Sequence, residues 1–263
     1  MKMANLARIE LRLVSDRKYL LFYALLLFIS TGFPFYGIAT YLGGELFRSG
    51  TPMAVKAQIL DLLGDSLLLR FSMTIYLIAA WGFIPRAFFT SKAEGEVETL
   101  LAMGFSGRAV WAAKALAVVL ISLVLSWPLL LLLVGALHWY AAAVVGGTIH
   151  WRAISILFAF LFNPLCGAGL VFLMGGLQLL ADDIRRSALG VFLLGVLNMG
   201  IMFGGGNTFS RSLMLVYGVL GVVLLVANIF LASRLTSENI ALSTIAGTRR
   251  ASGGRTQRFS VLS

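Results

Sequence analysis

The chain of 263 residues is 59% hydrophobic and only 12% charged, which lies far outside the range of soluble globular domains. The apolar residues form long continuous runs rather than short alternating segments, so they predict transmembrane helices and exclude a β-barrel. The formal net charge of +10 would be compatible with nucleic-acid binding, but the basic residues flank the apolar runs. We therefore expect an all-α polytopic membrane protein that binds no nucleic acid.

Residues 1–18 precede the first apolar run and predict an interfacial helix. Met3, Leu6, Ile9 and Leu13 recur at helical spacing, and charged residues occupy another face. The alternative is a charged leader that only orients insertion into the membrane.

Six apolar stretches are long enough to cross the hydrocarbon core, which requires about 20 helical residues. They cover 19–38, 67–89, about 110–137, 153–180, 187–204 and 212–233. An outer segment, 41–66, separates the first two spans and predicts a short helix of its own that begins near Pro52. The predicted layout is an interfacial helix (1–18), a six-span domain (19–233) and a basic, flexible cytoplasmic tail (234–263).

The basic residues predict the orientation of the spans. With six spans, sixteen of the 21 lysines and arginines lie on the side that carries both termini. By the positive-inside rule this side is cytoplasmic, which predicts a multi-pass protein of the cell inner (plasma) membrane in contact with lipids.

The connector between the second and third spans, 91–108, gathers three of the chain's few acidic residues. Glu94 and Glu98 are four residues apart and share one face of a predicted helix. Val97, Leu100 and Leu101 form an apolar patch beside them. A solvated loop would need neither the patch nor eighteen residues, so the pattern favours a cytoplasmic docking helix that breaks at Gly104 and Gly107.

At these residues the chain resembles the membrane subunits of ABC-2 type transporters. Their connector runs roughly Glu-Arg-Gly-Thr-Leu-Glu-x-Leu-Leu, then Pro-x-Ser, and ends in Gly-Lys. The matching positions here are Gly95, Val97, Glu98, Leu100, Leu101, Ser106 and Lys114. The departures are Glu96, Gly104 and Ala113, where Thr, Pro and Gly are usual. The short segment between spans five and six also lacks the re-entrant helices that such subunits often carry.

The resemblance implies a permease subunit driven by a separate ABC ATPase subunit. In the family the connector is a coupling helix that docks on the ATPase, and a second membrane subunit, identical or related, completes the pathway. The residues expected to make this contact are Glu94, Glu96, Glu98, Leu100 and Leu101. This chain has no phosphate-binding G-x-x-x-x-G-K-[ST] loop, so ATP and Mg²⁺ are expected in the partner, and no cofactor is expected here.

An enzymatic reading has little support. The string "GFSG" around Ser106 is similar to that of intramembrane serine proteases, but the only possible bases, His138 and His150, are predicted on the other side of the membrane. Cys166 is the single cysteine, and Asp182 and Asp183 adjoin arginines. We therefore expect neither catalytic residues nor a metal site.

Four amide side chains within the spans are the candidates for lining a pathway: Asn163, Gln178, Asn198 and Asn228. Hydrogen bonding between helices explains them equally well. The spans contain few ionisable groups, which argues against ion-coupled transport. An apolar pathway suits export of an amphiphilic or lipid-like substrate, and a peptide or a drug would also fit it. A membrane scaffold or channel-like protein without an ATPase is the alternative.

Overall fold

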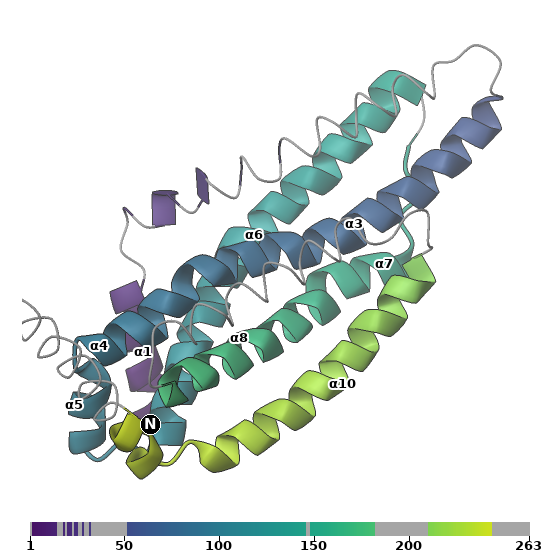
Figure 1. Cartoon of the computed structure of the whole chain (residues 1–263). Coiled ribbons are helices and arrows are strands. Elements are labelled where there is room, and N and C mark those ends of the chain that lie inside the picture. The colour runs from purple at the N-terminus through teal and green to yellow at the C-terminus, as the bar shows by residue number, and fades with distance from the viewer. Residues whose placement is uncertain are drawn as a thin grey trace, which may run out of the picture.

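The computed structural model describes residues 2–14, 52–145, 148–181 and 210–243, with single positions between 18 and 32. Within this part of the chain all regular structure is helical, which confirms the all-α class. The long helices lie side by side in a bundle, and helix α1 (Lys2–Val14) lies against one end of it (Figure 1). We call this the connector end, because residues 91–108 lie there too.

Helix α3 (Met53–Ile84) continues without a break into the π-helical segment η1 (Pro85–Thr90) and the final turn α4 (Ser91–Ala93). Pro85 lacks an N–H group for the carbonyl four residues earlier, and the helix widens there rather than ending. The expectation of a separate short helix before the second span is wrong, since no proline interrupts the chain between Met53 and Ile84. At 1.5 Å per residue, this helix is about twice as long as the hydrocarbon core is thick.

The part of α3 farthest from the connector end holds the loop at residues 148–152. The His150 backbone N–H donates to Asp61 Oδ1 at 2.8 Å, and Arg152 Nε lies 3.4 Å from Asp65 Oδ2. These polar contacts indicate that this part of α3 lies beyond the apolar part of the bundle.

The prolines of the other long helices have different effects on the helical structure. Helix α6 (Gly107–Val145) runs through Pro128 as one α-helix. In the next span, α7 (Ala153–Leu157) and the π-helical segment η2 (Phe158–Phe162) precede α8 (Asn163–Leu180), which has Pro164 in its first turn. The distortion expected at a proline is therefore present as π-helix before Pro164, whereas α6 stays helical across Pro128.

Four described helices are long and apolar enough to cross a membrane. They cover Ala54–Ala93, Gly107–Ala143, Ala153–Leu180 and Tyr217–Arg234, the last within α10 (Ser210–Arg234). They correspond to the second, third, fourth and sixth expected spans. The expected first and fifth spans, the acidic pair at 182–183 and the end of the tail lie outside the described residues, apart from isolated positions in the first.

Close packing in the bundle depends on glycines of α8, which lies between α3 and α10 (Figure 1). A Cβ atom added to Gly175 would lie 2.3 Å from the Phe88 ring of η1, and one added to Gly176 would lie 2.3 Å from Leu231 of α10. Small residues allow the helices to approach this closely. In a membrane the hydrophobic effect does not drive helices together, so van der Waals contact between them takes its place.

We predict that Gly175→Ala lowers the thermal unfolding temperature of the purified protein in detergent. The added methyl group overlaps the Phe88 ring, and overpacking of this kind costs about 1–3 kcal/mol. Gly135→Ala is the matched control, because no atom lies within 4 Å of its added Cβ and alanine favours helix. Equal unfolding temperatures for the two variants would contradict this account of the packing.

Candidate functional site

The predicted connector helix is divided into two pieces. The helix that contains α3 ends at Ala93, and α5 (Glu96–Ala102) follows after a turn at Glu94 and Gly95. Gly95 has φ = 77°, a left-handed conformation that a side chain would strain. This glycine is the physical reason why the connector does not form one helix over 91–108.

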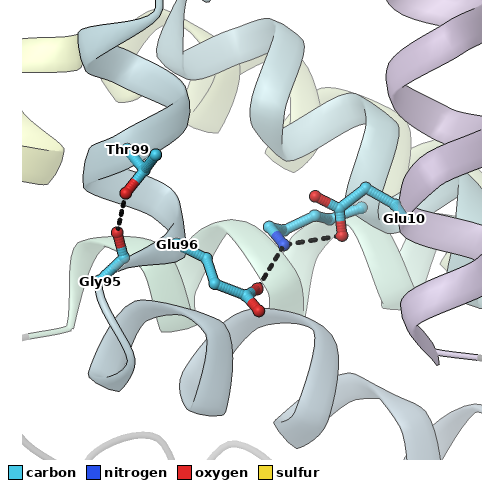
Figure 2. A network of polar contacts seen from close by, with 5 residues as sticks. Glu10, Gly95, Glu96 and Thr99 are labelled. Atoms are coloured by element: carbon cyan, nitrogen blue, oxygen red, sulfur yellow. Dashed lines mark hydrogen bonds and ion pairs between the residues drawn. The ribbon is translucent and has the colours of Figure 1, made fainter.

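Local hydrogen bonds fix both ends of α5. Its first turn is held by Thr99, whose hydroxyl donates to the Gly95 carbonyl at 2.9 Å (Figure 2). At its other end Gly104 has φ = 85°, and its N–H donates to the Leu101 carbonyl while that of Phe105 donates to the Leu100 carbonyl. This pair of bonds is the Schellman arrangement, so Gly104 ends the helix as expected.

A buried ion pair ties α1 to the beginning of α6. Lys114 Nζ lies 2.7 Å from Glu10 Oε2, and the two side chains are only 1% and 3% exposed. Glu96 of α5, with 40% exposure, places a carboxylate oxygen 3.8 Å from the same ammonium group (Figure 2). One lysine therefore connects the amino-terminal helix, the connector and a membrane-spanning helix.

Because Glu10 is buried, the stability of the protein depends on the Lys114 ammonium group that pairs with it. Burial is the largest influence on the Glu10 carboxyl and raises its pKa, Glu96 raises it further, and Lys114 lowers it. Removing one partner of a buried pair leaves the other charge uncompensated, which is more costly than removing both.

A second buried lysine precedes the connector. Lys92 Nζ donates to the carbonyls of Leu179 and Ala181 at 2.8 Å each, and to Ser243 Oγ at 2.7 Å. The last carbonyls of a helix have no partner within the helix and carry partial negative charge, which a cation offsets. Lys92 thus joins the end of α4 to the end of α8 and to the helical segment at 237–243.

The segment after α10 also packs directly on the start of α6. The Gly107 N–H donates to Ser237 Oγ at 3.3 Å. A Cβ at Gly107 would lie 2.8 Å from Ile240 and 3.0 Å from the Leu235 carbonyl oxygen. Residues 235–243 therefore pack against the start of α6 and the end of α8 at the connector end.

The five residues predicted to contact an ATPase do not share one environment. Glu94 is exposed, whereas Glu96 is directed toward Lys114 and Glu98 is partly buried. Leu100 and Leu101 are partly buried and pack against the core.

The exposed surface of the connector includes residues that the sequence did not single out. Met103 is 69% exposed, although its side chain is apolar. The exposed positions, which we call the connector surface, are Ala93, Glu94, Thr99, Ala102, Met103, Gly104, Ser106 and Arg108.

The amides predicted within the spans make contacts between helices where the structure describes them. Asn163 Nδ2 donates to the Leu69 carbonyl at 3.0 Å and to Ser72 Oγ at 2.6 Å. Asn228 Nδ2 donates to the Gly169 carbonyl at 2.9 Å, joining α10 to α8. Gln178 is buried with no hydrogen-bond partner among the described residues, and Asn198 lies outside them.

The geometry gives no support to a serine protease. Ser106 is exposed at the connector end, while His138 and His150 are exposed toward the opposite end. Ser106 and His138 are separated by about 48 Å of helix at 1.5 Å per residue. Within the described part of the chain, no three metal-ligating side chains come together.

Sequence reasoning missed the roles of Glu10, Lys92 and Lys114. From the sequence, Lys92 is assigned only to the basic residues that set the orientation, and Lys114 to those residues and to the matched motif. A signal for Glu10 was present, because it lies four residues after Leu6 on the apolar stripe of α1, and both are buried. Ile9, which was assigned to that stripe, is instead 56% exposed.

Comparisons with protein-family models, curated proteins and solved structures found no match to this chain.

We predict that Lys114→Met lowers the thermal unfolding temperature strongly. The change leaves the Glu10 carboxyl buried without its cation, and breaking a buried pair from one side costs about 3–5 kcal/mol. The double variant Glu10→Leu/Lys114→Met should recover most of the loss, because neither charge then remains. If the double variant is as unstable as the sum of the two single variants, the pair does not interact as described.

Proposed function

We propose that this chain is the membrane permease subunit of an ABC-2 type transporter and that the connector surface docks on a separate ATPase subunit. The single observation that carries the proposal is the placement of α5. It lies between two left-handed glycines, with Glu96 directed inward to Lys114 and an outer surface that includes Glu94, Thr99 and Met103.

The contacts that attach the connector region to the spanning helices support a role in transmitting force. A docking element can move membrane-spanning helices only if its own attachment to them is stiff. Here Lys114 joins α5 and α1 to α6, and Lys92 joins the end of α4 to α8. Movement imposed on α5 would therefore be passed to three spanning helices together.

The ATPase contact falls on the connector surface in this proposal. Glu94 offers charge there, and Met103 offers an exposed apolar side chain that can fill a pocket. Leu100 and Leu101 then support the surface from within, whereas Glu96 and Glu98 contribute through their exposed parts.

The remaining parts of the proposal follow from the same role. The connector end lies on the cytoplasmic side of the inner (plasma) membrane, where ATP and Mg²⁺ are available to the ATPase. A second membrane subunit completes the pathway, and the cargo is an amphiphilic or lipid-like molecule that is exported through apolar surroundings.

The test is to co-express the tagged chain with an ATPase encoded beside its gene and to measure how much ATPase co-purifies. We predict that Glu94→Lys/Met103→Asp reduces the amount of co-purified ATPase, and its ATP hydrolysis, by about tenfold. Glu94→Lys reverses the charge offered to the partner, and Met103→Asp places a carboxylate where an apolar side chain is proposed to be buried. A tenfold loss corresponds to about 1.4 kcal/mol.

Val55→Asp is the matched control, because Val55 is an exposed apolar residue near the far end of α3. It should leave capture unchanged. Capture of no ATPase by the wild-type chain, or equal capture by the connector variant, would overturn the proposal and favour a scaffold or channel without an ATPase.

A further inference from the structure

Residues 148–152, which we call the strap, lie along the part of α3 that is farthest from the connector end. Asp61 Oδ1 accepts the His150 backbone N–H at 2.8 Å, and Asp65 Oδ1 accepts the Arg152 backbone N–H at 3.4 Å. Each aspartate also faces the side chain of the same strap residue. Asp61 Oδ2 lies 3.8 Å from His150 Nδ1, and Asp65 Oδ2 lies 3.4 Å from Arg152 Nε. Two aspartates of α3 therefore hold the strap in the same way.

Both contacts can form together because the helix and the strap advance by nearly the same distance. Asp61 and Asp65 are four residues apart, which is about 6 Å along an α-helix at 1.5 Å per residue. His150 and Arg152 are two residues apart, which is about 6.6 Å along an extended chain. The strap is thus in register with one turn of α3.

Gly64 lets the strap lie close to the helix between the two contacts. A Cβ atom added to Gly64 would lie 3.3 Å from Ile149 Cγ2 and 3.4 Å from the Trp151 ring. Ile149 is only 5% exposed and belongs to the apolar cluster that contains Leu60 and Leu137. The Ile149 side chain is therefore covered as long as the strap stays on α3.

The contact between His150 and Asp61 is the one that we expect to depend on pH. Histidine ordinarily gains or loses its charge between pH 5 and 8, whereas arginine keeps its charge. A protonated imidazole is attracted to the Asp61 carboxylate, and a neutral imidazole is not. His150 is 82% exposed and Asp61 is 33% exposed, so the attraction is modest, as it is in other exposed ion pairs. The titratable and charged groups on the elements packed beside His150 are Lys56, Asp61 and Asp65 on α3, His138 and Tyr140 on α6, and Arg152 in the strap.

We propose that the strap is a pH-sensitive latch between α3 and the start of the fourth span. At acidic pH the charged His150 holds the strap on α3, and as the pH rises this attraction is lost and the strap lifts more often. Arg152 directly precedes α7, so lifting of the strap releases the first turn of α7 from α3. In the proposed orientation the strap faces the outside of the cell and senses the pH of the medium. The latch requires no ATPase, so it stands or falls independently of the proposed transport function.

The test is the rate at which a fluorescent maleimide labels Ile149→Cys, in the full chain with Cys166→Ala, reconstituted in nanodiscs. The thiol is covered by the closed strap and reacts when the strap lifts. Each rate is divided by that of Trp139→Cys, a position on α6 that is 72% exposed, which removes the effect of pH on the maleimide reaction itself. We expect this corrected rate to be about two- to fivefold higher at pH 8 than at pH 5.5, the contribution of one exposed ion pair.

Three substitutions separate the groups that could cause such a difference. His150→Gln should abolish the difference between the two pH values, because the glutamine side chain stays neutral. Asp61→Asn should also abolish it, since asparagine keeps an acceptor for the backbone N–H but has no charge to attract His150. His138→Gln is the matched control, because it removes the other histidine of the chain and should leave the difference unchanged.

Hydrogen exchange in the chain without cysteine substitutions is the second measurement, and it decides the question if Ile149→Cys disturbs the packing. After correction for the intrinsic exchange rate, protection of the peptide that covers 148–152 should fall between pH 5.5 and pH 8 by a similar factor. The proposal is overturned if corrected labelling and protection are the same at both pH values. It is also overturned if His150→Gln keeps the difference or His138→Gln abolishes it.

Discussion

Two buried lysines hold together the end of the bundle that carries the connector. Lys114 pairs with Glu10 at 2.7 Å, and Lys92 donates to two carbonyls at the end of α8. A lysine is costly to bury unless its charge is met by acceptors, so each contact is specific in partner and position. The relative placement of α1, α5, α6 and α8 depends on these contacts.

Contacts along the rest of the bundle hold the helices in fixed relative positions. Glycines of α8 let η1 and α10 approach closely, and Asn163 and Asn228 add hydrogen bonds from α8 to α3 and from α10 to α8. Close-packed helices of this kind move as units rather than deforming continuously. In our proposal, a movement imposed at α5 is passed along the packed helices α3, α6 and α8 as units.

The sequence predicted features that follow from local composition, and missed those that depend on contacts between distant segments. Apolar runs located four spans that the structure describes, and Gly104 was identified as the end of the connector helix. Gly95 was seen only as a motif position, although its left-handed conformation divides the connector. The pairing of Glu10 with Lys114 joins residues 104 positions apart, and no local pattern specifies such a partner.

The most direct test of the central claim is whether Met103 lies on a cytoplasmic docking surface. Met103→Cys, in a chain whose single Cys166 is replaced by alanine, can be treated with a membrane-impermeant maleimide. We predict labelling in inverted membrane vesicles but not in intact cells, and reduced labelling of the vesicles when the ATPase is co-expressed. Labelling from outside intact cells, or labelling that the ATPase leaves unchanged, would contradict the account.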